Sequence, residues 1–267
     1  RHCYFGGPHE GDRASYAISA GDRFNDASSI RFDGAKMGER NYDLPLMDLA
    51  YNGKPSTISE INWTSPNRFR AEMPILCAAY GQLQGTDAFF FFATDEVGWA
   101  QSLGKCALSD PAALGQFPAA ALLYRRGLVK TAAAVVRAEV KLADLQALKG
   151  LPVLAPQNLD ELRKKDVPAG KAAAAEAMKS LDPLVFLVGR VEVHVTDQGG
   201  ASQFVDLSKL IDRKTNVVKS ATGELVWNFG AGLVTIDAPA AQGVIGFLSK
   251  AGAISLGAMT IQTPLEH

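Results

Sequence analysis

The chain has 267 residues, 47% of them hydrophobic, and a formal net charge of −1. This length suits one large domain or two modest ones, and the apolar content is enough to bury a core. Balanced charge argues against a nucleic-acid-binding protein, which normally carries a basic excess or stripe. No apolar run approaches the roughly 20 residues that a membrane helix needs, so we expect neither nucleic acid nor a membrane as a partner.

Up to about residue 128 the pattern alternates between strand and helix. The predicted elements are, in chain order, a strand at 1–5, a helix at 44–51, a strand at 56–63, a helix at 69–83, a strand at 87–93 and a helix at 110–126. Pro55 and Pro66 bound the β-branched segment, whereas Asp110-Pro111 is typical of a helix start. The apolar run 87–93 predicts a strand buried on both faces. Alternation of this kind predicts parallel pairing of the strands.

After about residue 129 the character of the chain changes. The elements predicted here are a strand at 132–142, a helical turn at 143–148, helices at 158–166 and 171–181, and short strands at 186–195, 222–228, 233–237, 243–248 and 258–263. Strands separated by turns every 8–12 residues or so are typical of a β sandwich. We therefore predict a domain at 1–128 and a β-rich domain at 129–264.

Both ends of the sequence have unusual features. It begins with Arg1 rather than Met, within a predicted strand, and it ends in Leu265-Glu266-His267, which resembles the remnant of a tag. We leave residues 265–267 out of the fold prediction. We expect the natural N-terminus to lie upstream.

Cysteines and histidines show no metal-binding pattern. Cys3, Cys77 and Cys106 are widely spaced and form no C-x-x-C pair, so we interpret them as buried or free thiols. His9 and His194 lack the neighbours that a zinc site requires. No metal and no cofactor are expected.

The segment 57–63 contains the most informative residue of the chain. In a parallel α/β barrel, catalytic groups lie at the carboxyl ends of the strands. Glu60 lies near the end of its predicted strand, just before Asn62-Trp63. A carboxylate there can attack the anomeric carbon of a sugar, provided that a second carboxyl group lies about 5 Å away. The alternative is an ordinary salt bridge or cap.

The neighbouring strands strengthen the catalytic interpretation. His2-Cys3-Tyr4 ends the preceding strand, and a run of four phenylalanines, 89–92, forms the next one. This order resembles strands six, seven and eight of the clan A retaining glycoside hydrolases, a fold of the (β/α)8 barrel type. Three further segments resemble a large bacterial branch of such enzymes, namely 67–72, 79–85 and 114–119. The resemblance covers residues 1–128 or so and implies a partial (β/α)8 barrel, followed by a mainly β, sandwich-like domain with some helix.

The resemblance also implies a role for each residue. Glu60 would be the nucleophile that forms a glycosyl-enzyme ester. Tyr4 would donate a hydrogen bond that lowers the pKa of this carboxylate, and His2 would order the polar network or contact a sugar hydroxyl. Substrate-binding residues would be Trp63 and Trp99, through ring stacking, together with Asn62 and Asn67. Ordinary packing is the alternative for His2, Tyr4 and both tryptophans.

One departure from the clan concerns the general acid/base. The clan carries this residue on strand four, usually as Asn-Glu, and the chain starts at strand six. Carboxylates on loops that could reach the same cleft are Glu10, Asp12, Asp95 and Glu96, but none matches the clan's position. Protonation of the leaving group typically supplies about 10²–10⁴-fold in rate. We therefore expect this fragment to be weakly active or inactive on ordinary glycosides.

Three strands of an eight-stranded barrel leave unpaired edges and an uncovered apolar face. We therefore expect a homo-oligomer, or a separate chain that supplies the missing strands. The substrate would be a carbohydrate, and the full-length parent would be secreted or periplasmic.

Two other functions remain open. One is a carbohydrate-binding or assembly module that has lost turnover, in which Trp227 could stack on sugars or lie between sheets. The other is an ester hydrolase, because Ser102-Leu103-Gly104-Lys105 matches the S-x-x-K pattern, in which Lys helps to activate Ser. No G-x-S-x-G or phosphate-binding loop is present.

Overall fold

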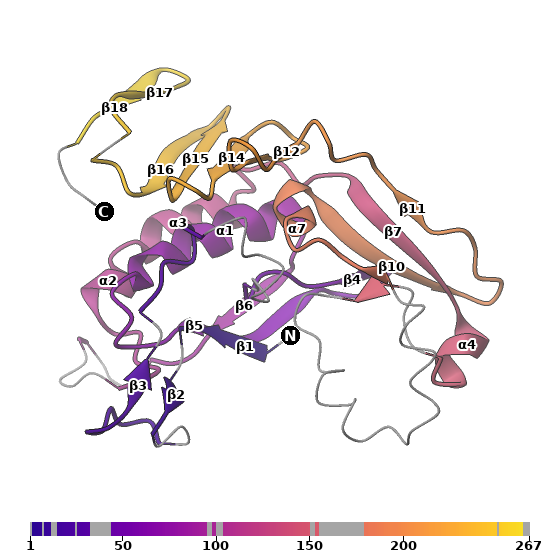
Figure 1. Ribbon diagram of the computed structural model, residues 1–267, viewed down its shortest axis with the longest axis horizontal. Coiled ribbons are helices and arrows are strands. Elements are labelled where there is room, and N and C mark those ends of the chain that lie inside the picture. The colour runs from indigo at the N-terminus through magenta and orange to yellow at the C-terminus, as the bar shows by residue number, and fades with distance from the viewer. Residues whose placement is uncertain are drawn as a thin grey trace.

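The computed structural model describes residues 2–6, 8–11, 15–24, 26–32, 44–94, 98–99, 104–149, 153–154, 179–249 and 251–263. The fold is mixed α/β with several sheets and more strand than helix, and no closed barrel forms within these ranges. Figure 1 shows the helices α1 and α3 between the small sheet that contains β1, β5 and β6 on one side and the sheet that contains β14, β15 and β16 on the other; the latter sheet has five strands.

The small sheet contains the strands that the sequence analysis singled out. Its order is β1 (His2–Phe5), β5 (Thr57–Trp63) and β6 (Ala88–Phe91), and both pairings are parallel. The parallel arrangement predicted from alternating strands and helices is therefore confirmed for these three strands. In the register of β1 and β5, His2 lies opposite Glu60 and Tyr4 lies opposite Asn62.

The predicted helix at 69–83 is confirmed. It consists of a short 3-10 turn, η2 (Arg70–Glu72), and α1 (Met73–Gln84), which ends at Gly85. Gly85 has a φ of 70°, the left-handed conformation that commonly terminates helices.

The predicted helix at 110–126 is two helices, α2 (Pro111–Leu114) and α3 (Phe117–Arg125). Asp110 caps α2 as expected, because its side chain accepts a hydrogen bond from the backbone N of Ala113 at 3.0 Å. The break has a simple cause. Pro118 cannot donate a backbone hydrogen bond and its ring would clash inside a continuous helix, so it begins a new one.

Two predictions about local structure are wrong. Residues 44–51 form a turn followed by β4 (Ala50–Tyr51) rather than a helix. Leu44, Leu46 and Met47 are all buried, so the chain here is packed on several sides rather than along one stripe. The strand β6 is not buried on both faces, since the Phe90 side chain is 59% exposed. Among the described residues, the helical layer covers only one face of this sheet.

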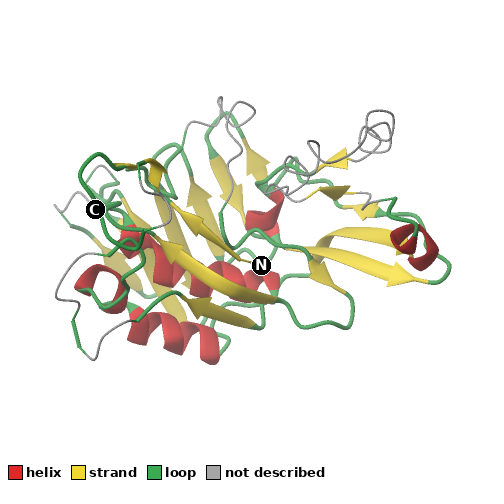
Figure 2. Cartoon of the chain, turned by 90° about the horizontal axis from the view of Figure 1, so that it is seen from below, coloured by secondary structure: helices red, strands yellow, loops and turns green. Residues whose placement is uncertain are grey.

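A second sheet has the order β11 (Gln203–Phe204), β7 (Ala134–Lys141), β10 (Arg190–Thr196) and β4. The long pair of β7 and β10 extends away from the helices, with α4 (Leu142–Gln146) at its far end (Figure 2). The strand predicted at 186–195 begins later than expected, because Val185–Val188 form one helical turn, α7. All four of these residues are buried, and a short apolar run does not distinguish a helical turn from a strand.

The third sheet is an antiparallel meander. Its strands follow chain order: β12 (Ile211–Asp212), β13 (Val217–Lys219), β14 (Leu225–Asn228), β15 (Leu233–Ala238) and β16 (Ala241–Gly246). Three hairpins or short pairs complete the strands: β2 (Pro8–Glu10) with β3 (Arg23–Phe24), β8 (Val153–Leu154) with β9 (Lys179–Ser180), and β17 (Ile254–Leu256) with β18 (Met259–Ile261). The helix predicted at 158–166, and most of that at 171–181, lie outside the described residues.

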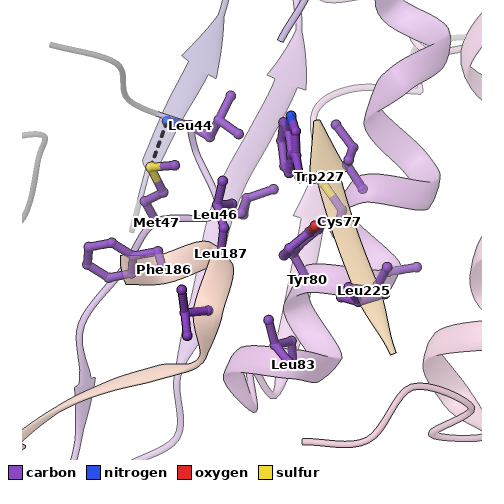
Figure 3. Close-up of a cluster of buried hydrophobic side chains, with 14 of the residues drawn as sticks. Leu44, Leu46, Met47, Cys77, Tyr80, Leu83, Phe186, Leu187, Leu225 and Trp227 are labelled. Carbon is purple, nitrogen blue, oxygen red and sulfur yellow. Dashed lines mark hydrogen bonds between the residues drawn. The ribbon is translucent and has the colours of Figure 1, made fainter. Parts of the chain in front are cut away.

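Both halves of the sequence contribute to one connected core. Figure 3 shows Cys77 and Tyr80 of α1 against Trp227 of β14, with Phe186 of α7 nearby. The Tyr80 and Trp227 rings lie 5.1 Å apart between centroids. The five-stranded sheet thus packs on a helix through this tryptophan. The domain boundary near residue 129 stays a prediction.

Candidate functional site

Glu60 is half-buried and lies within β5, three residues before the strand ends at Trp63. The register between β5 and β6 shifts between Ile58 and Ile61, so that Glu60 lies at a β-bulge. Bulges re-aim side chains and are common beside active sites. The shift also explains why Ile58 and Ile61 are both fully buried although they are three residues apart. Nothing in the sequence pattern revealed this bulge.

Asn62 is fully buried and fastens two loops at the carboxyl end of the small sheet. Its Nδ2 donates to the backbone O of Phe92 at 2.6 Å and to that of Cys106 at 2.7 Å. Its Oδ1 has no hydrogen-bond partner among the described residues. The NH2 group of Asn62 is thus fully engaged in hydrogen bonds to the backbone. Its Oδ1 is the atom that could still accept a hydrogen bond from a ligand or a water molecule.

The other predicted substrate-binding residues of β5 and its following loop are buried. Trp63 is 0% exposed, and its ring centroid lies 5.4 Å from that of Phe5. A ring without an exposed face cannot stack on a sugar, so ordinary packing describes Trp63. Asn67 is also buried: its Nδ2 donates to the O of Ala27 at 2.9 Å, and its Oδ1 accepts from the N of Phe69 at 2.8 Å.

Aromatic rings gather around Phe92, just beyond β6. The Tyr4 ring meets Phe92 edge-on at 6.4 Å, and the Tyr16 ring lies 5.9 Å from it. Tyr4 is half-buried, whereas Tyr16 is 60% exposed and Trp99, seven residues beyond Phe92, is 55% exposed. Tyr16 and Trp99 therefore each expose ring surface that a ligand could contact. Tyr16 was not among the predicted site residues. The side chain of His2 lies outside what the structure describes.

A buried ion pair that the sequence analysis missed supports this end of the sheet. Arg70 is 4% exposed, and its Nε donates to the backbone O of Trp63 at 2.7 Å. Its guanidinium also pairs with Asp110 and donates to the backbone O of Ala107. Arg70 thus joins β5 to the loop that leads into α2. Its signal in the sequence was a charged residue within the predicted helix at 69–83.

A second buried charge orders the loop before β4. Glu72 is 0% exposed and accepts hydrogen bonds from Ser28 Oγ at 2.6 Å, Ser29 N at 2.7 Å and Ser29 Oγ at 2.6 Å. Glu72 lies four residues before Leu76, on the apolar stripe of α1. A carboxylate on an apolar stripe is costly to bury without hydrogen-bond partners. The position of Glu72 on this stripe was therefore the feature of the sequence that could have indicated a buried, hydrogen-bonded carboxylate.

The structure describes only Lys105 of the two residues of the ester-hydrolase alternative. Lys105 is buried, and its Nζ forms an ion pair with Asp22 Oδ2 at 3.1 Å. An ammonium group held by a carboxylate is a poor base, and Ser102 lies outside the described residues. Among the carboxylates on loops, Asp12, Asp95 and Glu96 also lie outside the described residues, and the side chain of Glu10 is not described either. The same holds for the side chains of Cys3 and His9.

Trp227 has no exposed face that could stack on a sugar. It is fully buried against α1, and its Nε1 donates to the backbone O of Ile30 at 2.8 Å. Cys77 is buried and Cys106 half-buried, each as a thiol. In the part of the chain that the structure describes, no cluster of His, Cys, Asp or Glu could hold a metal ion. No helix within the same ranges is both long and apolar enough to cross a bilayer.

Comparison of the chain with models of protein families, with curated proteins and with solved structures finds no match. A functional proposal therefore depends on the residues and their geometry alone.

Proposed function

We propose that this chain derives from a retaining glycoside hydrolase, with Glu60 in the position of the nucleophile and with little or no turnover of ordinary glycosides. The main support is the side-by-side parallel order of β1, β5 and β6, which is the order of strands six, seven and eight in such a barrel. The finer description of the fold, a partial (β/α)8 barrel followed by a mainly β domain, is part of this proposal.

The position of Glu60 suits the chemistry. A half-buried carboxylate at a bulge, opposite His2 and two register pairs before Tyr4, can present an oxygen to a sugar bound at the carboxyl end of the strands. In the first step a bond forms between this oxygen and the anomeric carbon, while the bond to the leaving group breaks. Tyr4 is the neighbour that would keep the carboxylate ionised.

The low rate that we expect on ordinary glycosides results from the leaving group, which is not protonated. None of the carboxylates of the chain matches the clan's acid/base position, so an alkoxide would have to depart without a proton. The missing step is worth about 10²–10⁴-fold. A leaving group that needs no protonation removes this requirement, and it therefore tests the nucleophile separately from the acid.

The experiment uses 2,4-dinitrophenyl 2-deoxy-2-fluoro glycosides of the gluco, galacto, manno and xylo series. Dinitrophenolate leaves without acid assistance, and the fluorine slows hydrolysis of the glycosyl ester so that it accumulates. We expect mass spectrometry to find one added fluorosugar on the peptide that contains Glu60.

Two variants complete this test. Glu60→Gln should abolish the mass gain, whereas Glu224→Gln, which changes a carboxylate bound to the backbone N of Lys130, should leave it unchanged. Circular dichroism checks that both variants fold. Labelling at another residue, equal labelling of Glu60→Gln, or no labelling by any of the four reagents would contradict the proposal.

A second candidate is carbohydrate binding without turnover, which the exposed rings of Tyr16 and Trp99 favour. Aromatic rings cover the apolar C–H face of a sugar. In this case Trp99→Ala should weaken the binding of soluble oligosaccharides, measured by calorimetry, whereas Glu60→Gln should not change it. A Trp99→Ala variant that binds as the wild type does would exclude this candidate.

A further inference from the structure

A cavity of about 380 Å³ lies at the amino ends of the parallel strands, away from the carboxyl end toward which β5 runs beyond Glu60. Ser56 and Asp87, which immediately precede β5 and β6, line it. They are joined to each other, because the backbone N of Ser56 donates to Asp87 Oδ2 at 2.7 Å. This cavity is therefore separate from the region of Glu60 that the proposed function uses.

One wall of the cavity is a row of polar side chains on β10. Arg190, Glu192 and His194 alternate with Val191 and Val193, which are buried on the other face. The Glu192 carboxylate is held from both sides: Oε1 lies 2.6 Å from Arg190 Nη2, and Oε2 lies 2.8 Å from His194 Nε2. These three side chains fix one another in place before any ligand binds.

The opposite rim is a turn that is tied to the same strand. Asn52 donates its backbone N to the O of Val193 at 3.0 Å, and its Oδ1 accepts from the N of Val195 at 2.9 Å. The turn brings Lys54 and the 41% exposed ring of Tyr51 to the cavity. In Figure 1, β4 correspondingly lies beside β10.

The formal charges of the lining cancel. Lys54 and Arg190 oppose Asp87 and Glu192, and Glu192 already pairs with Arg190. A free anion would meet Asp87, and a free cation would meet Lys54, so no net field favours either. Donors and acceptors are instead intermixed.

We infer that this cavity binds a neutral saccharide unit. Sugar hydroxyls donate and accept at once, which matches a lining where carboxylate oxygens and guanidinium or ammonium hydrogens alternate. The Tyr51 ring, which is 41% exposed, offers an apolar surface to the C–H face. Because the cavity lies away from Glu60, the site anchors a saccharide and does not cleave it. The inference does not depend on the identity of Glu60 as a nucleophile.

The test is calorimetric titration with a panel of soluble gluco-, galacto-, manno- and xylo-oligosaccharides. We expect at least one series to bind. Glu192→Gln should weaken this binding roughly 10- to 100-fold, because it removes a charge-assisted acceptor and the group that positions Arg190 and His194. Lys54→Ala, a change at an exposed turn that folding should tolerate, should weaken it several-fold.

Two control variants locate the binding. Arg137→Ala changes a side chain beside Glu192 in register but outside the lining, and it should bind as the wild type does. Glu224→Gln, which changes a carboxylate bound to the backbone N of Lys130 and also outside the lining, should do the same.

The inference is overturned if no saccharide of the panel binds, or if both Glu192→Gln and Lys54→Ala keep the wild-type affinity. It is also overturned if inorganic phosphate binds in place of the saccharides and Lys54→Ala weakens that binding. Loss of saccharide binding only in Trp99→Ala would overturn it too, while still supporting a carbohydrate site at the other end.

Discussion

At the residue scale, the buried pair of Arg70 and Asp110 is the group most sensitive to change. Removing one member of a buried ion pair leaves an uncompensated charge and typically costs about 3–5 kcal/mol. Arg70 also donates to the backbone O of Trp63 and of Ala107, and these acceptors would be left unpaired as well. We expect Arg70→Ala to lower the free energy of unfolding by about that amount, as measured by urea denaturation.

Arg68 provides the matched control for Arg70. It pairs with Asp26 at 2.9 Å, but the two side chains are 72% and 47% exposed. Exposed pairs contribute about 1 kcal/mol or less, so Arg68→Ala should change stability little. Equal losses in the two variants would show that burial of the Arg70 pair is not what matters.

Tyr124 gives a pH prediction. Burial, with a smaller effect of the Asp87 carboxylate, raises the pKa of Tyr124 to about 12. The ordinary value of about 10 applies when the chain is unfolded. The contribution of Tyr124 to stability is therefore complete below pH 10 or so and is lost as the pH rises toward 12. Tyr124→Phe should show a shallower decline of unfolding free energy across this interval, and a decline as steep as that of the wild type would contradict the assignment.

The sequence disclosed the site only in part at this scale. The resemblance to strands six, seven and eight of a barrel predicted that Glu60 would lie beside the His2 strand, and the alternation of strands and helices predicted that the two would be parallel. The sequence did not predict that Trp63 and Asn67 would be buried, because side chains at a strand end face either the cleft or the core. Arg70 and Glu72 were missed because a charged residue is normally assigned to the surface.

At the element scale, α1 contains a glycine that propensity alone would mark for replacement. Ala is better than Gly inside a helix by about 0.5–1 kcal/mol. At Gly81, however, a Cβ atom would lie 2.4 Å from Cε2 of Phe89 on β6. Crowding of this kind typically costs about 1–3 kcal/mol. We therefore expect Gly81→Ala to destabilise the fold in thermal and urea unfolding.

The partner residue tests the cause of this effect. In a double-mutant cycle, Phe89→Leu should recover much of the loss caused by Gly81→Ala, because the two sites are in contact. Strictly additive effects would mean that crowding against Phe89 is not the source.

Elements with a strong period were predictable, and elements decided by distant contacts were not. The helix of α1 and the strand β5 follow from helical spacing and β-branched content. The conformation of residues 44–51 is instead decided by β10. Ala50 and Tyr51 pair with this strand although it lies some 140 residues away in sequence. Tertiary contacts of this kind are absent from any local pattern.

At the scale of the whole molecule, the small sheet leaves β1 and β6 at its edges in the described structure. Phe90 of β6 is 59% exposed beside such an edge. Unpaired edges and exposed aromatic rings favour pairing with another chain. We propose that the chain forms a homo-oligomer through this sheet, and that Phe90→Lys shifts sedimentation velocity profiles toward the monomer. A wild-type monomer at micromolar concentration would contradict this.

The hydrogen bond from Trp227 to Ile30 spans 197 residues of sequence. Tyr80 of α1 is covered by the same tryptophan, which the ribosome adds long after the helix. During synthesis one apolar side of α1 therefore stays uncovered until β14 emerges, and contacts of such long range form slowly. A nascent chain of this protein would expose that apolar surface in the interval.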